Sequence, residues 1–135
     1  MTNRDANVTS TGRRNLRCGD FRGQSLTGAD FSYADMSYAD LTRTRLGGAN
    51  LTGAILDNTI LCGADLRQAN LRGAYLANAK ANGADFTGAD LTQACLVSAS
   101  ARESSFRGAT LTKARCCGAD FNYSDFSGAR LDLAH

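Results

Sequence analysis

The sequence is informative first through what it lacks. Its 135 residues include no proline and no tryptophan, and the one histidine, His135, is the last residue. A catalytic triad or a metal hydrolase needs a histidine held in position, so a terminal histidine disfavours both. No apolar run approaches the roughly 18 residues needed to cross a bilayer. We therefore expect a protein that is not an enzyme, uses no cofactor and does not span a membrane.

The charge and the first residues narrow the class further. The formal net charge is +2, too small for strong attraction to nucleic acid or anionic lipid. The first fifteen residues, MTNRDANVTSTGRRN, contain no apolar segment of the kind that marks a secretory signal. These features predict a cytoplasmic protein that binds neither nucleic acid nor a membrane directly.

The cysteines do not form a recognisable framework. There are five, at positions 18, 62, 95, 116 and 117, and an odd number at irregular spacing does not indicate a set of disulfides. A zinc site needs paired ligands, whereas adjacent residues of an extended strand, such as Cys116 and Cys117, point to opposite faces. We expect free thiols and no metal site.

A period of five residues dominates the chain. From Leu16 to Leu131 every fifth residue, here called the centre of a repeat, is apolar, through 24 repeats without a break. Two residues before the centre, 17 of the 24 positions are alanine, and two residues after it 11 are glycine. The residue just before the centre is often Asp or Asn. Neither a helix nor a straight strand places residues five apart in one environment.

All the centres share one environment only if the chain bends once in every repeat. Each pentapeptide is then one short side of a coil, and successive coils stack. Glycine suits the bend because several tight turns require a positive φ, and the absence of proline keeps every N–H available between coils.

Two substitutions favour a coil of four sides over one of three. Ala81 and Ala101 replace the large centre, and each is followed five residues later by Phe86 or Phe106. In a coil of 20 residues these two pairs stack directly, and each small residue makes room for the neighbouring ring.

Stretches such as ADFTGADLTQACL and GANLTGAIL resemble the pentapeptide repeat family, whose consensus is close to A(D/N)LxG. The resemblance covers residues 14–133. It implies an all-β fold, a right-handed quadrilateral parallel β-helix (β-solenoid) of about six coils with four pentapeptides each. Residues 1–13 are predicted to be a polar, disordered N-terminal tail, and residues 134–135 follow the last repeat.

The charged residues of the repeats do not indicate catalysis. Asp65 and Asp85 fall in equivalent positions one coil apart, which resembles a carboxylate dyad, but arginines such as Arg45 and Arg67 lie nearby. Arginine pairs such as Arg67 and Arg72 are five residues apart and therefore lie on different sides. We interpret these charges as solvated surface positions.

The best-known family activity is inhibition or protection of DNA gyrase by a rod that mimics duplex DNA. That activity implies a strongly acidic rod, whereas this chain has a positive net charge and 13 arginines. The resemblance therefore supports two functions: a non-catalytic protein–protein interaction scaffold with an unknown protein partner, as in small cyanobacterial members, and, as the alternative, a DNA-mimic modulator of gyrase or topoisomerase. A scaffold needs an uncharged patch, and a mimic needs continuous acidic columns.

One side of the coil is predicted to be the binding surface. Sorted by the 20-residue register, three sides carry mostly Asp, Arg, Thr, Ser and Gly. The fourth replaces several of these with apolar residues, and Ile60 on the adjacent side extends it. An exposed apolar patch with a polar rim is typical of a contact surface. Its predicted residues are Ile55, Tyr75, Ala77, Cys95 and Val97.

A second candidate contact is the last coil. Its centres have no further coil above them and its backbone groups are unpaired, which favours stacking of two C-terminal ends into a homodimer. The predicted end-stacking residues are Cys116, Phe121, Phe126 and Leu131.

Overall fold

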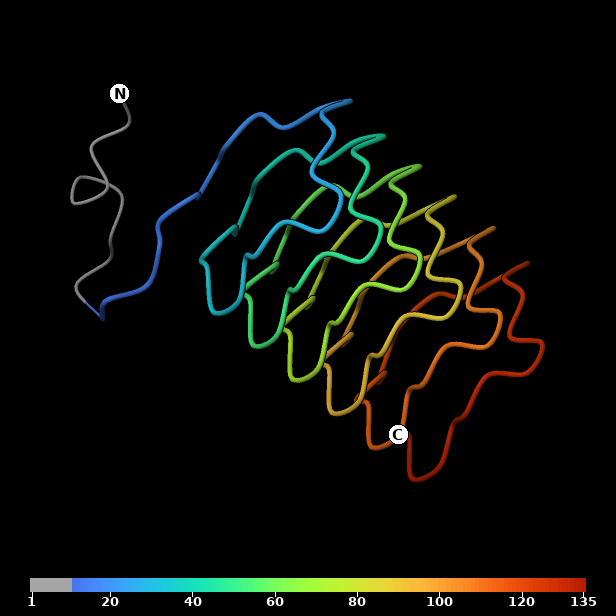
Figure 1. Cartoon of the computed structure of the whole chain (residues 1–135). Helices are drawn as coiled ribbons and strands as arrows, with labels where there is room; N and C mark the ends of the chain where they lie inside the picture. Colours follow the sequence, from blue (N-terminus) through green and yellow to red (C-terminus); the bar gives the residue numbers. More distant parts are fainter. Residues whose placement is uncertain (1–10) are drawn as a thin grey trace.

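In the computed structural model the chain is a rod of stacked coils, described for residues 11–135 (Figure 1). These residues contain no helix and no extended strand; the regular structure is a series of isolated parallel bridges. Each bridge joins a residue to the one 20 positions later, from Asn15 with Asp35 to Thr110 with Arg130. One coil therefore takes four pentapeptides, the spacing that the alanine substitutions predicted.

Each side of the coil is held to the next coil by three backbone hydrogen bonds. At Leu56 the N–H donates to the carbonyl of Tyr75 at 2.6 Å, and the N–H of Asn58 donates to the carbonyl of Ala77 at 2.9 Å. The N–H of Tyr75 returns a bond of 2.9 Å to the carbonyl of Ala54. A proline at any of these donor positions would break the ladder, which excludes proline from them.

The bends occupy the two residues after each centre. The N–H of the third residue donates back to the carbonyl of the centre, as from Ala54 to Leu51 at 3.0 Å. The second residue has a positive φ in every repeat, and in 13 of them, including Asn78 and Lys113, it is not glycine. A positive φ at this position is the mark of a type II turn. Non-glycine residues adopt it at a cost on the order of 1 kcal/mol, which the ladder on both sides of the turn offsets.

The core is a filled column of centres and of the alanines that precede them. Centres from Met36 to Leu111 are almost fully buried, as are the alanines between Ala34 and Ala114. Thr44, Thr59 and Ser104 stand where an alanine is expected, yet they are buried too. Each hydroxyl donates to a carbonyl 23 residues earlier, as from Ser104 to Ala81 at 2.8 Å. A small polar residue is tolerated inside the rod because a backbone acceptor lies within its reach.

The phenylalanines stack along the rod axis where the neighbouring column is small. The rings of Phe86 and Phe106 lie 4.7 Å apart and nearly parallel, and Phe106 and Phe126 repeat this geometry. Ala81 and Ala101 are the buried centres of the adjacent side. In the last coil that side carries Phe121 instead, whose ring meets Phe106 and Phe126 edge-on.

Enlarging Ala101 tests this packing. We expect Ala101→Leu to destabilise the fold by about 1–3 kcal/mol, because the added volume must displace the stacked rings of Phe86 and Phe106. The control is Leu41→Met, in the same column but away from the rings, which should cost less than about 1.5 kcal/mol. Equal urea midpoints for both variants would show that the small centres do not accommodate the rings.

Candidate protein-binding face

The side whose centres are Leu16, Met36, Leu56, Leu76, Leu96 and Cys116 is called face A. Bridges join Asp35 to Ile55, Ile55 to Tyr75 and Tyr75 to Cys95, so the residues before these centres form one uninterrupted column. A second column holds the residues after the centres. There the N–H of Asn78 bonds the carbonyl of Val97 and the N–H of Ser98 bonds the carbonyl of Cys117. The five residues predicted to form the binding surface thus lie together.

The side chains of these five residues are partly or largely open to solvent. Tyr75 is 49% exposed, and Ile55, Ala77, Cys95 and Val97 are intermediate in exposure. None belongs to the buried core of the rod. Face A therefore presents an apolar strip that the rod does not need for its own packing.

In many repeats, including the first two of face A, the residue before the centre closes its own turn. An Asp or Asn there accepts a hydrogen bond from the backbone N–H two residues later, as Asp65 does from Arg67 at 3.1 Å and Asp90 from Thr92 at 2.9 Å. Twelve repeats show this bond. The recurring acid of the repeat is thus a turn-closing acceptor.

On face A this internal acceptor is missing from the repeats that carry Ile55, Tyr75 and Cys95 before the centre. Tyr75 cannot accept the N–H of Ala77, and the carboxylate of Asp57 in the preceding coil accepts it instead at 2.8 Å. Cys95 likewise offers no side-chain acceptor to the N–H of Val97. The residue one coil earlier is Ala77, which has no side-chain acceptor either. In the described part of the chain the N–H groups of Asp57, Val97 and Cys117 have no hydrogen-bond acceptor, as is also true of some equivalent residues on other sides, such as Gly47 and Thr112. An apolar strip with backbone donors beside it suits a partner that supplies carbonyl or carboxylate groups.

The N-terminal end of face A is polar, and its side chains bond one another. Asp35 and Ser37 are buried, and Asp35 accepts bonds from the Ser37 hydroxyl at 2.7 Å and from Arg17 at 3.4 Å. The Arg17 guanidinium also lies over the ring of Tyr38. Burial raises the pKa of Asp35, but the bonds from Ser37 and Arg17 outweigh it, and the net pKa is lowered. This charged cluster is a polar rim for the apolar strip.

The segment before the first repeat also lies against face A. The Arg13 guanidinium donates to the carbonyls of Tyr33 at 3.4 Å and Gly53 at 3.3 Å. Thr11 and Arg13 line a hollow of about 430 Å³ together with Asp35, Ile55, Asp57 and Tyr75. Of the tail predicted over residues 1–13, residues 1–10 lie outside the described residues.

Sequence reasoning missed three features of this region. The position of Arg13 was not predictable from the repeat, because Arg13 precedes it. Tyr33 and Tyr38 lie at the two corners of face A and are 57% and 55% exposed. They occupy the glycine position of their repeats, and that substitution was the available signal. The turn-closing role of the acids was a local Asx pattern that the consensus already contained.

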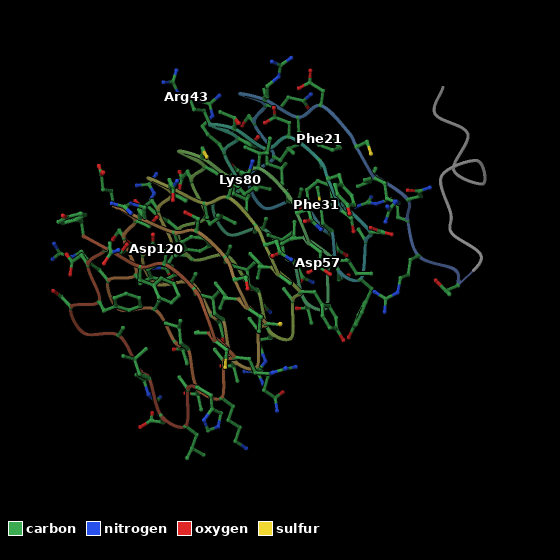
Figure 2. The ribbon with its side chains drawn as sticks, turned by 180° about the vertical axis from the view of Figure 1, so that it is seen from behind. Phe21, Phe31, Arg43, Asp57, Lys80 and Asp120 are labelled. Atoms are coloured by element: carbon green, nitrogen blue, oxygen red, sulfur yellow. The ribbon has the colours of Figure 1, made fainter. Side chains whose placement is uncertain are left out.

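Ile60, proposed to extend the face, lies in the next column along the adjacent side. It is bridged to Asp40 on one side and to Lys80 on the other. Figure 2 shows Lys80 and Asp120 on that same side of the rod, and the bridges place them in one column with Ser100. Charged residues therefore surround Ile60, which contributes little apolar area beyond face A.

The candidate end-stacking residues also lie together. Cys116, Phe121, Phe126 and Leu131 line an apolar hollow of about 360 Å³ with Leu111, Ala134 and His135. His135 continues the ladder, because its N–H donates to the carbonyl of Ala114 at 2.9 Å and its carbonyl accepts from Cys116. Leu131 is 50% exposed. That two copies stack through this end stays a prediction.

The charged residues outside face A are largely paired. Arg67 bonds Asp65 at 2.7 Å and approaches Asp85 at 3.9 Å, so the suspected carboxylate dyad carries its own counter-ion. Arg22 repeats the arrangement with Asp20 and Asp40. Hydrogen bonds from Arg22 lower the pKa of Asp20 to about 2, and the Arg67 side chain lowers that of Asp65. These carboxylates are stabilised as anions and are unsuited to accept or deliver protons near neutral pH.

Neither a metal site nor a disulfide is found in the described residues. Residues 11–135 hold no group of three or more His, Cys, Asp or Glu residues that suits a metal ion, and the five cysteines are unpaired. Burial raises the pKa of the Cys116 thiol, which makes it a poor nucleophile. Within the same residues, no helix is long and apolar enough to cross a membrane.

Comparison with known proteins agrees with the geometry. The family model described as pentapeptide repeats matches residues 13–43, 34–68, 69–108 and 102–135. A pentapeptide repeat protein of the cyanobacterium Cyanothece 51142, Rfr23, has a crystal structure that matches with a TM-score of 0.67. It is 27% identical, and the match covers 82% of this chain and 86% of that one. No curated protein sequence matches significantly.

Two further solved structures match with lower TM-scores. One is a pentapeptide repeat protein of the Arabidopsis thaliana thylakoid lumen, 35% identical over 81% of this chain and 66% of its own, with a TM-score of 0.31. The other is QnrB1, a plasmid-mediated fluoroquinolone resistance protein, 22% identical over 87% and 65% of the two chains, with a TM-score of 0.36. Likeness at this level supports no argument about this chain's activity.

The stacked coils define a β-solenoid that is built from very short repeats. The chain belongs to the pentapeptide repeat family and has its right-handed β-helix fold. The members of this family are generally structural or interaction proteins, and no evidence links this chain to a catalytic family.

The turn-closing carboxylates make the stability of the fold depend on pH in the acidic range. The folded pKa of Asp20 is about 2, below the ordinary value of 3.8, so its contribution is complete above 3.8 and is lost as the pH falls toward 2. Asp30, Asp65, Asp90 and Asp125 shift in the same direction. We expect the thermal midpoint to fall across this window. Asp65→Asn keeps the turn acceptor without the charge and should show a shallower fall; a midpoint constant down to pH 2 would contradict this.

Proposed function

We propose that this protein is a non-catalytic scaffold that binds a protein partner through face A. The observation that carries the proposal is the replacement of turn-closing acids by Ile55, Tyr75 and Cys95 in one continuous column. Each replacement gives up an internal acceptor and exposes apolar surface. The adjacent side also loses the acid in three coils, at Ile60, Lys80 and Ser100, but there two of the three replacements are polar. The apolar character of all three replacements on face A is what a surface kept for contact would show.

The surroundings of the strip support a protein partner in particular. Three of the four tyrosines, Tyr33, Tyr38 and Tyr75, lie on face A or at its corners, and all three are about half exposed. Tyrosine is enriched at protein interfaces because its ring buries a large area while its hydroxyl stays satisfied. Arg17 with Asp35 at one end and Arg115 at the other supply a polar rim.

We propose further that the scaffold is a rod of about six coils of four pentapeptides. The 24 centres from Leu16 to Leu131 divide into six groups of four at the bridged spacing of 20 residues. At about 4.8 Å for each coil the rod is roughly 29 Å long. Stacked coils make such a face rigid before binding, which lowers the entropic cost of association.

The alternative, a DNA mimic that modulates gyrase or topoisomerase, fits the charges poorly. A mimic needs rows of unpaired anions, whereas Asp65, Asp90 and Asp120 each contact an arginine. Such pairing removes the negative potential that imitates a phosphate backbone. We expect no effect on gyrase supercoiling at low micromolar protein, measured by gel assay; inhibition there would favour the mimic over the scaffold.

Charging the apolar strip tests the scaffold. We expect Tyr75→Asp combined with Val97→Asp to abolish capture of the proteins that the wild-type chain retains from native lysate, because a partner must then bury two new charges. The fold should survive, since neither side chain is in the core and an Asp at position 75 stands in the turn-closing position. The matched control, Ser100→Asp with Asn122→Asp, adds the same charge to the adjacent side and should retain capture. A double variant of face A that binds every wild-type partner would exclude this face.

A further inference from the structure

We propose that the partner of face A is an acidic amphipathic helix, which packs its apolar side along the strip and places carboxylates beside Lys113 and Arg115. The proposal rests on the binding function proposed above and specifies the chemistry of the partner. It is supported by the charge at one end of the strip and by the spacing of the coils.

The apolar column of face A ends beside two exposed cations. Cys95 is bridged to Arg115, so Arg115 continues the column into the next coil. Lys113 lies two residues earlier, at the same corner of the rod as Tyr33. The side chains of Lys113 and Arg115 are both exposed. A ligand that covers the strip and extends past Cys95 therefore meets two positive charges.

These two cations have no counter-ion within residues 11–135. Neither Lys113 nor Arg115 forms a salt bridge there. Asp132 lies close by, since its carbonyl accepts the N–H of Lys113 at 2.9 Å, but its carboxylate contacts Arg130 at 3.6 Å. Exposed cations that the rod itself leaves unneutralised favour a partner that brings carboxylates.

The opposite end of the strip is electrically balanced. Arg13 and Asp57 line one hollow there, and Arg17 contacts Asp35 at 3.4 Å. The carboxylate of Asp57 accepts a backbone N–H and forms no salt bridge within the described residues. An acid brought to this end would meet two carboxylates as well as the arginines, so we expect the acids of the partner at the other end only.

Cations at the equivalent position on other sides lie in polar columns. Arg45 is bridged to Asp65. Lys80 is bridged to Ile60 and Ser100, and beyond these two residues the column is acidic in both directions. Within residues 11–135, a column of three apolar residues that continues into an exposed cation is therefore found on face A alone.

The spacing of the coils favours a helix over an extended segment. Successive residues of the column lie about 4.8 Å apart, so the three spacings from Ile55 to Arg115 cover about 14 Å. Side chains one turn apart on a helix are separated by about 5.4 Å along its axis and drift from the coils by about 2 Å over this length. Side chains on one face of an extended strand are about 6.7 Å apart and drift by about 6 Å. Successive turns of a helix can therefore meet successive coils.

Peptide selection on the full chain tests this partner. Random peptides of about 14 residues, long enough for the strip and one further turn, are displayed on phage and selected at low salt. The targets are the wild-type chain and the variant that combines Tyr75→Asp with Val97→Asp. Peptides that need face A should carry apolar residues three and four positions apart. They should also carry Asp and Glu, enriched about threefold over the library, in the turn at one end.

Removing the two cations separates their role from that of the strip. Selection on Lys113→Gln combined with Arg115→Gln should keep the apolar spacing and lose the acid enrichment. A peptide selected on the wild type should bind this variant about fivefold more weakly. Glutamine suits the corner, because Gln93 adopts the same positive φ one coil earlier. Arg43→Gln combined with Lys80→Gln removes the same charge from exposed positions on the adjacent side and should change neither result.

Each contrary result has a separate meaning. Face A peptides without acid enrichment, or with an enrichment that survives the loss of Lys113 and Arg115, would overturn the acidic partner and leave the proposed function standing. Apolar residues at alternate positions would indicate an extended partner and overturn the helix. If no selected peptide depends on Tyr75 and Val97, the proposed function fails and this inference fails with it. Self-association in sedimentation that Tyr75→Asp abolishes would place a second copy on the strip and overturn the proposal.

Discussion

The structure depends on the backbone ladder that joins each residue to the chain about twenty positions later. Three hydrogen bonds on each side of a coil hold the next coil in register, as the bonds of Leu56, Asn58 and Tyr75 illustrate. Because the ladder and the turns pair most of the backbone groups, a side needs only one bridged residue and no extended strand. It also fixes the conformation of the bends, since Asn78 and Lys113 adopt the positive φ that glycine adopts elsewhere. The sequence is then free to vary wherever a side chain points outward.

That freedom explains how a surface arises on a repetitive rod. The turn-closing acid is a preference and not a requirement, because an acceptor from the previous coil can replace it, as Asp57 does for Ala77. Once the turn no longer depends on the residue before the centre, that position can carry Ile55, Tyr75 or Cys95. The stacking places such residues about 5 Å apart, so substitutions twenty residues apart in sequence form one continuous strip.

Much of the fold was predictable because a five-residue period leaves few geometric solutions. The four sides followed from Ala81 and Ala101, whose neighbouring rings do stack in the structure. The columns of face A followed from the same register. The acceptor role of Asp65 and the buried bond of Ser104 were harder to predict, since they depend on which backbone group lies within reach. The position of Arg13 was beyond prediction, because nothing in the repeat determines where a preceding residue folds back.

Rigidity and local openness are therefore separate properties of this rod. The core of Leu, Phe and Ala residues is filled and its buried hydroxyls are bonded, so the coils offer little room for movement. Face A differs from the other sides only in its outward residues, and its backbone follows the same ladder. Recognition must then come from side chains and N–H groups displayed on a fixed frame. A partner has to adapt to the spacing of the coils, because the coils cannot adapt to it.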